Sequence, residues 1–252
     1  MLNNYDSLCD DFYYDMYVNT ELDLPASRDT ILSFFERVQK QFPSMNSFYR
    51  RDAGEYCLEE RDRTENSRWI AIEKDRIGSG LINPSHHNSI YTQHRLVLEL
   101  IPYMLGVSHL DIRCLDVTIA MDFCYAGSHD EIIAEALFGS SAFSCLLDLP
   151  SASPIGFSPA VVVALSEDCR TQARVSVESK TSVAEPPRKE QNPDEAITLS
   201  LTVRQYPRGT EKFDALQSFE DQCRLVEQLM AERIIPEFVY PINNVIAQKR
   251  LV

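Results

Sequence analysis

The sequence predicts an α+β fold made of two tandem β-α-β-β-β-α units, with an antiparallel sheet and helices packed on one face. The first observation is a gapless alignment of residues 15–32 with residues 116–133, at a constant offset of 101 positions. The second is that both segments alternate like a strand, then present a helix-capping serine, then repeat with helical period. The identical pairs of this alignment are Asp15/Asp116, Ser27/Ser128, Asp29/Asp130 and Ile31/Ile132.

Each unit opens with a half-buried strand. Apolar and polar side chains alternate through residues 16–24 and again through 117–125, which is the pattern of a strand with one wet face. Val18 and Ile119 occupy the same phase of the two strands. Because a slip of one residue would turn the opposite side inward, we expect both strands to bury the same side.

A helix follows each opening strand. Ser27 and Ser128 are the expected N-caps, because a short hydroxyl side chain can accept from the free backbone N–H groups of the first turn. The apolar spacing predicts that the first helix continues to Phe42 and that the second covers residues 130–138.

The remaining elements complete each unit with three strands and a closing helix. The expected strands are 46–51, 55–61 and 68–76 in the first unit and 160–166, 172–179 and 197–204 in the second. The closing helices are expected at 91–105, and at 213–235 with an end at Pro236 and a short further helix over 237–250.

The domain boundaries follow from these elements. We expect an acidic N-terminal arm over 1–14, a first α+β repeat over 15–110, and a second repeat with C-terminal helices over 111–252. Residues 180–196 contain three prolines and many charges, which predicts a mobile loop between two strands of the second repeat.

This order of elements is similar to the helix-on-curved-sheet folds of the TATA-binding-protein type. It is also similar to the tandem strand–helix–strand–strand modules of GyrI-like small-molecule binders. The resemblance lies in topology alone and rests on no shared motif, so it implies an architecture and transfers no function.

Composition bears on the partners and the compartment. A net charge of −14 opposes contact with phosphate backbones, so no nucleic-acid partner is expected. No run approaches about 18 apolar residues, so no membrane partner is expected. The seven cysteines form no Cys-x-x-Cys pair, which favours buried thiols over disulfides or zinc. The N-terminus lacks a basic region followed by an apolar core, so a cytoplasmic protein is expected.

No motif marks a metal or cofactor site, and neither is expected. The segment Gly78-Ser79-Gly80 lacks a phosphate-loop lysine and a dinucleotide fingerprint, so it indicates a bulge or turn at a strand end. The histidines between His86 and His94 suggest no complete ligand set, which favours solvated loop side chains.

Whether the protein is an enzyme stays open. His109 and Asp111 would share one face of a strand, where a carboxylate can orient an imidazole, and Cys114 follows them. These three are the candidate catalytic residues. The alternative is an ordinary polar pair at the start of a strand.

Aromatic and charged side chains near the opening strand and the first hairpin are candidates for binding. Trp69, the single tryptophan, is expected either to pack on the sheet or to wall a binding cleft. Tyr17 lies beside Asp15 in an acidic, tyrosine-rich stretch that would suit a cationic partner, or would simply favour solubility. Arg50 opens a mixed-charge cluster. The candidate binding residues are therefore Trp69, Tyr17 and Arg50.

Three functional hypotheses remain. The favoured one is a binding or interaction module for a small molecule or peptide, with its site at the junction of the two repeats. The second is an enzyme whose site is dispersed along the chain. The third is a homo-oligomeric structural or assembly protein in which edge strands pair between subunits.

Overall fold

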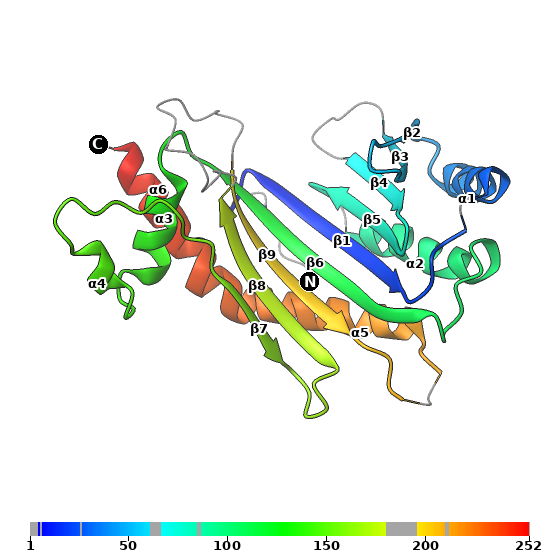
Figure 1. Ribbon diagram of the computed structural model, residues 1–252. Helices are drawn as coiled ribbons and strands as arrows, with labels where there is room; N and C mark the ends of the chain where they lie inside the picture. The colour runs from blue at the N-terminus through cyan, green and yellow to red at the C-terminus, as the bar shows by residue number, and fades with distance from the viewer. Residues whose placement is uncertain are drawn as a thin grey trace.

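The fold is organised around one antiparallel sheet, which has nine strands within the part of the chain that the structure describes (Figure 1). The computed structural model describes residues 5, 7–25, 27–60, 67–84, 87–179, 196–209 and 212–251, with the backbone alone for 87 and 88. The strand order is β2-β3-β4-β5-β1-β6-β9-β8-β7. The strands are β1 (Asp11–Thr20), β2 (Met45–Arg50), β3 (Tyr56–Glu60), β4 (Ser67–Ile72), β5 (Arg76–Ile82), β6 (Ile112–Cys124), β7 (Ala160–Ala164), β8 (Thr171–Ser179) and β9 (Ala196–Gln205).

Helices cover one face of this sheet. Helix α2 contacts β5, while α5 contacts β6 and β9 and passes behind the sheet in Figure 1. The helical segments are α1 (Arg28–Gln41), α2 (His87–Met104), α3 (His129–Ile133), η1 (Ala134–Phe138), α4 (Ser144–Leu147), α5 (Ala215–Leu229), η2 (Met230–Val239) and α6 (Tyr240–Arg250), where η marks a π-helical turn. The predicted α+β class with an antiparallel sheet is therefore confirmed in this general form.

The two opening strands lie next to each other at the centre of the sheet. Strand β1 pairs antiparallel with β6, and Met16 stands opposite Val117. Val18 and Ile119 both point to the helices and are 0% and 1% exposed, as their shared phase predicts. The sheet runs without interruption across the boundary expected at residues 110 and 111.

Two of the predicted helix starts are confirmed by their capping bonds. The Ser27 side chain accepts from the backbone N–H of Thr30 at 3.2 Å, and Ser128 accepts from that of Glu131 at 3.3 Å. Each serine satisfies a backbone donor that the first helical turn leaves without an intrahelical partner.

Two buried glutamines fix the helices on the sheet. Gln93 of α2 donates from Nε2 to the carbonyl oxygens of Trp69 and Gly80, at 3.2 and 3.1 Å. Gln222 of α5 donates from Nε2 to carbonyl oxygens of β6 and β9, at 2.7 and 2.8 Å. Because a buried amide must find partners, these bonds restrict where each helix can lie.

Some elements differ from the prediction. Strand β1 begins at Asp11, so the expected N-terminal arm over 1–14 includes the first residues of a central strand. The segment expected as one strand over 68–76 ends at Ile72, and β5 follows as a separate strand. Gly78 and Gly80 therefore lie inside a strand rather than at its end, which corrects the interpretation of that segment.

Pro236 does not end its helix. The chain continues as η2 through Pro236 and then as α6, without leaving the helical region. The wider i→i+5 spacing of a π-helix removes the i→i−4 bond that proline breaks in an α-helix. The loop expected over 180–196 falls almost entirely on residues 180–195, which lie outside the described residues; β9 begins at Ala196.

Candidate functional site on the helix-free face of the sheet

The sheet face opposite α2 and α5, here called the helix-free face, carries a row of polar and aromatic side chains. Residues directly opposite each other on neighbouring strands point to the same face. The register aligns Trp69 of β4, Gly80 of β5, Asp15 of β1 and Thr118 of β6 in one row. Tyr17 points the same way as Asp15, because it lies two residues further along β1.

Trp69 lies directly over the backbone of β5. Its Nε1 atom is 2.2 Å from the position that a Cβ would take on Gly80, and its Cζ3 atom is 2.9 Å from the corresponding position on Gly78. Only glycine leaves room for an indole at these distances. The Tyr17 ring packs beside it, with ring centroids 6.0 Å apart and planes tilted by 47°.

Asp15 lies beside the indole over Gly80, and one of its carboxylate oxygens lacks a hydrogen-bond partner. Its Oδ1 atom is also 2.2 Å from the Cβ position of Gly80, is shielded from solvent and accepts no hydrogen bond. Loss of hydration raises the pKa of Asp15 to about 7. The residue as a whole is partly exposed, as are Tyr17 and Trp69.

The neighbouring carboxylate of Asp116 has the opposite environment. Arg204 of β9 donates to it from Nε and Nη2, each at 2.7 Å, which is a bidentate pair. Asn19 adds a bond from Nδ2 at 3.3 Å. Asp116 is 6% exposed, so its charge is compensated where it is desolvated.

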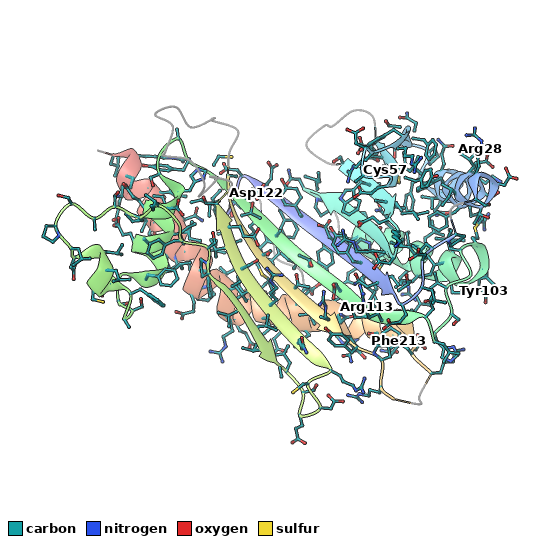
Figure 2. All side chains as sticks on the ribbon, viewed as in Figure 1. Arg28, Cys57, Tyr103, Arg113, Asp122 and Phe213 are labelled. Atoms are coloured by element: carbon teal, nitrogen blue, oxygen red, sulfur yellow. The ribbon has the colours of Figure 1, made fainter. Side chains whose placement is uncertain are left out.

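Other polar side chains of the helix-free face are also paired. Asp122 accepts from the Tyr13 hydroxyl at 2.9 Å and from the Thr198 hydroxyl at 2.6 Å. Thr118 and Thr202 share a hydrogen bond of 2.8 Å. Figure 2 labels Arg113 and Asp122 near the two ends of β6, between which these groups lie. The unpaired carboxylate oxygen of Asp15 is therefore an exception on this face.

One cation already lies at the edge of the group. The Arg76 guanidinium is 4.9 Å from the centre of the Tyr17 ring. It donates to the Glu73 carboxylate from Nε at 2.9 Å and from Nη2 at 2.7 Å. Arg76 thus shows that the Tyr17 face accepts a cation, but its charge is held by Glu73 rather than by Asp15.

We call Asp15, Tyr17, Trp69, Gly78 and Gly80 the Asp15 site. It combines one desolvated carboxylate with two aromatic rings, a set that favours an organic cation by charge and by cation–π attraction. The same carboxyl, with a pKa of about 7, can gain or lose a proton near neutral pH.

The structure brings together two of the three candidate binding residues. Trp69 and Tyr17 are in contact at the Asp15 site. Arg50 lies at the edge strand β2, where its guanidinium is 5.2 Å from the ring centre of Tyr56. Tyr56 stands in register with Ile72 and so belongs to the helix side of the sheet, away from the other two.

Sequence reasoning did not identify Gly80 as part of a site. The available signal was a pair of glycines two residues apart near the single tryptophan, since residues i and i+2 of a strand leave the same face bare. That signal requires Gly78 and Gly80 to lie within a strand, whereas the sequence alone predicts a bulge or turn at a strand end.

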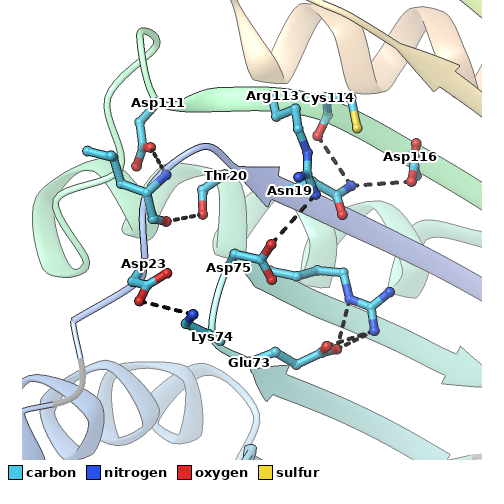
Figure 3. A network of polar contacts seen from close by, with 12 residues as sticks. Asn19, Thr20, Asp23, Glu73, Lys74, Asp75, Asp111, Arg113, Cys114 and Asp116 are labelled. Carbon is cyan, nitrogen blue, oxygen red and sulfur yellow. Dashed lines mark hydrogen bonds and ion pairs between the residues drawn. The ribbon is translucent and has the colours of Figure 1, made fainter.

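The three candidate catalytic residues do not converge. His109 is exposed, while Asp111 accepts from the backbone N–H of Leu22 at 2.9 Å and supports the end of β1 (Figure 3). Cys114 is buried in β6, and burial raises the pKa of its thiol. No hydrogen bond joins these three side chains, all of which belong to the described residues. A catalytic role for them stays a prediction.

Figure 3 shows that Asp111 and Cys114 belong to a network at the junction of the two expected repeats. Asn19 donates to the carbonyl of Cys114 at 3.5 Å, and Arg113 lies 3.7 Å from Asp75 across the strand ends. The network joins the end of β1, the turn between β4 and β5, and the start of β6. Its members are bonded to one another, which is the behaviour of a structural contact.

No group of three or more His, Cys, Asp or Glu side chains is placed to hold a metal ion within the described residues. His94 is fully buried, with its Nδ1 atom 3.0 Å from the Ser79 hydroxyl. His94 is therefore not a solvated loop residue, which corrects that expectation. His86 lies outside the described residues.

A pocket lies between the end of β9 and the start of α5. This pocket has a volume of about 460 Å³ and is lined by charges of both signs, including Arg208, Lys212, Asp214 and Asp221. Asp214 caps α5, and Arg208 lies 3.6 Å from Asp168. Because Arg208, Asp214 and Asp221 already have partners, whereas the Oδ1 atom of Asp15 has none, the Asp15 site is the stronger candidate.

Comparisons with family models, with curated proteins and with solved structures found no match to this chain. These comparisons give no support to the expected likeness to TATA-binding-protein-type or GyrI-like folds. Within the described residues, no helix has the length and apolar character needed to cross a membrane.

Proposed function

We propose that this chain is a binding module for a small organic cation, carrying a guanidinium or ammonium group, and that the ligand binds at the Asp15 site. The observation that carries the proposal is the Asp15 carboxylate, which is desolvated beside Trp69 and has no hydrogen bond to its Oδ1 atom. A bound cation would supply the missing charge, and the rings of Trp69 and Tyr17 would contact its apolar part.

The environment of Asp116 supports this assignment. In the β1–β6 register, Asp15 faces Thr118 and Asp116 faces Tyr17, so the two carboxylates flank the Met16–Val117 pair. Asp116 is held by Arg204, its partner on the outer neighbour β9, whereas the corresponding partner of Asp15 on β5 is Gly80. A ligand cation at Asp15 would play the part that Arg204 plays at Asp116.

We propose further that this correspondence results from tandem duplication of one β-α-β-β-β-α unit, to which the first half adds the edge strand β2. The offset of 101 residues maps Met16 onto Val117, and these two stand opposite each other, as a local two-fold axis between β1 and β6 requires. Outward from this axis, β5, β4 and β3 on one side correspond to β9, β8 and β7 on the other. The buried amides of Gln93 and Gln222 also recur in the closing helices α2 and α5.

The overall charge favours the same class of ligand. A net charge of −14 attracts cations from solution and excludes anions. The ligand is small in this proposal because the site is a patch of two aromatic rings and one carboxylate, which matches a single cationic group.

The single tryptophan gives a direct experiment. Trp69 fluorescence is titrated with agmatine and with tetramethylammonium chloride, and sodium chloride at the same ionic strength serves as the reference. We expect saturable changes with the organic cations and a flat response with sodium chloride. Asp15→Asn should weaken binding at least tenfold, because it removes the charge and keeps the shape.

Asp75→Asn is the matched control, since it removes an equal charge from a side chain that is 48% exposed. It should leave the titration within a factor of two of the unaltered protein. The proposal fails if Asp15→Asn titrates like Asp75→Asn, because attraction would then come from the overall charge alone.

A second candidate function rests on the same carboxyl group. A group with a pKa of about 7 suits general acid–base catalysis, so Asp15 could act on a ligand that Trp69 and Tyr17 position. Mass spectrometry of a ligand recovered after incubation separates the two candidates. A binding module returns the ligand unchanged, whereas an enzyme converts it and Asp15→Asn stops the conversion.

A further inference from the structure

The edge strand β7 is exposed on both of its faces. Val161, Val162 and Val163 are 59%, 58% and 47% exposed, and all five residues of the strand are open to solvent. Within the described residues, β7 pairs with β8 alone and ends the sheet. A long row of exposed valines at a sheet edge is a liability unless another strand covers it.

The sequence of β7 is symmetric and uncharged. It reads Ala-Val-Val-Val-Ala, a palindrome centred on Val162. Edge strands that must stay single usually carry lysine, proline or a bulge, and β7 has none of these between Ala160 and Ala164. A strand that is its own reverse presents the same side chains to an antiparallel copy of itself.

The backbone geometry has the same centre of symmetry. The carbonyl of Pro159 accepts from Val177 at 2.9 Å, and the N–H of Leu165 donates to Thr171 at 2.7 Å. Backbone groups alternate in direction along a strand, so the odd-numbered residues bond to β8. The N–H and C=O groups of Ala160, Val162 and Ala164 therefore point to the free edge.

We infer that two copies of this chain associate through β7, with the strands antiparallel and Val162 facing Val162 of the second copy. Val162 would exchange both backbone hydrogen bonds with its counterpart, and Ala160 would do so with Ala164 on each side. Because the same patch serves both partners, the interface is a closed two-fold contact rather than an open chain. This inference is independent of ligand binding at Asp15.

The side chains fit this pairing. Val161 of one copy would stand opposite Val163 of the other on the helix side of the sheet, so four valines would form an apolar cluster. On the helix-free face, Arg174 flanks Val162 in register and is paired with Glu178 at 3.8 Å. The segment that precedes β7 and contains α4 lies beyond β7 in Figure 1. It carries further exposed apolar side chains: Phe143, Leu146, Leu149 and Ile155.

Sedimentation equilibrium and light scattering test the dimer. The unaltered chain should show twice its monomer mass at micromolar concentration, and Val162→Lys should return it to the monomer mass. Phe48→Lys is the control, because Phe48 is 45% exposed on β2, the opposite edge of the same sheet. Circular dichroism and melting temperature confirm that both variants fold.

A monomer at all concentrations up to about 100 µM would overturn the inference. So would open polymers that Phe48→Lys abolishes, because these would join β7 to β2 rather than β7 to itself. Equal dissociation by Phe48→Lys and Val162→Lys would point to nonspecific charge repulsion and would also overturn it.

Cross-linking tests the register. In a chain whose exposed Cys145 and Cys169 are changed to serine, Val162→Cys should form an intermolecular disulfide, because facing residues of such a pair are about 5.5 Å apart at Cα. Val161→Cys should link poorly, since its copies lie diagonally at about 7–8 Å. Equal cross-linking at both positions would contradict the palindromic register.

Discussion

The indole of Trp69 occupies the space in which any side chain on Gly80 would lie. The Nε1 atom of Trp69 and the Oδ1 atom of Asp15 both approach to 2.2 Å of that Cβ position. The absence of one side chain thus allows an aromatic ring to lie over β5 and places a carboxylate beside it. The Asp15 site depends on this glycine as much as on the groups that would touch a ligand.

Gly80→Ala should therefore displace the indole and disturb the carboxylate. We expect a loss of about 1–3 kcal/mol of stability from overpacking and loss of cation binding. Chemical denaturation and the fluorescence maximum of Trp69 measure these effects. The double variant Gly80→Ala/Trp69→Phe should recover part of the stability, because the two changes are coupled. Strictly additive losses would show that the alanine clashes with something other than Trp69.

Asp15 should make stability depend on pH in an unusual direction. Its pKa is about 7 in the folded protein and about 3.8 when the chain unfolds, so the folded state binds more protons between these values. The contribution of Asp15 to the unfolding free energy is fully present below about pH 3.8 and is lost as the pH rises to about 7. Asp15→Asn should thus be more stable than the unaltered protein at pH 8, by about 2–4 kcal/mol. Urea denaturation at pH 4 and pH 8 measures the difference.

The same group should control ligand affinity over that range. A guanidinium stays charged throughout, so its affinity should rise as Asp15 ionises, and should level off above about pH 8. Titrations of Trp69 fluorescence with agmatine at pH 6, 7 and 8 test this. Binding through an ordinary exposed carboxylate would be constant across the series, and such a result would exclude Asp15 as the partner.

The central strands were predictable because their signal is local. The alternation of apolar and polar residues sets the phase of Val18 and Ile119. Because side chains of a strand alternate with a period of two residues, only one side of each strand can be buried. The caps at Ser27 and Ser128 were predictable for the same reason, since the hydroxyl and its backbone partner lie within three residues.

The site itself depends on register across strands that are far apart in sequence. Trp69 reaches Asp15 only because β4 pairs with β5 and β5 pairs with β1, and no periodicity within one segment contains that information. Strand β5 was hidden as well, because Gly78 and Gly80 have low strand propensity. Their positions are explained by the indole above them, which is a contact visible only in three dimensions.

The ion pair at Asp116 gives a prediction about stability on the helix-free face. Arg204→Ala should lower the unfolding free energy by about 1–3 kcal/mol. The change leaves the Asp116 side chain, which is 8% exposed, without its cation, while Asn19 still donates a hydrogen bond to it. Arg174→Ala removes a cation from a surface pair, 55% and 62% exposed, and should cost less than about 0.5 kcal/mol. Urea denaturation of both variants compares them. Equal costs would show that the bidentate pair does not compensate Asp116.

His94 should oppose Asp15 when the protein is acidified. Its ring is fully buried, stacked on Tyr14 with ring centroids 6.0 Å apart and edge-on to Phe219 at 5.5 Å. Desolvation lowers the pKa of His94 to about 3. The unfolded chain therefore binds the extra proton between about pH 6.5 and pH 3, so stability falls as the pH falls through that window. Between pH 6 and pH 4 this loss should amount to about 2–3 kcal/mol.

His94→Leu should remove that loss, whatever its effect on stability at neutral pH. The measurement is the difference in unfolding free energy between pH 6 and pH 4, taken within each variant. His109→Leu is the control, because His109 is exposed and should leave the difference unchanged. Asp15→Asn separates the two groups. In a chain that keeps His94 it removes the opposing contribution of Asp15, so the unfolding free energy should fall more steeply from pH 6 to pH 4. If the change in unfolding free energy from pH 6 to pH 4 is the same in His94→Leu as in the unaltered protein, another buried base opposes Asp15 in this window.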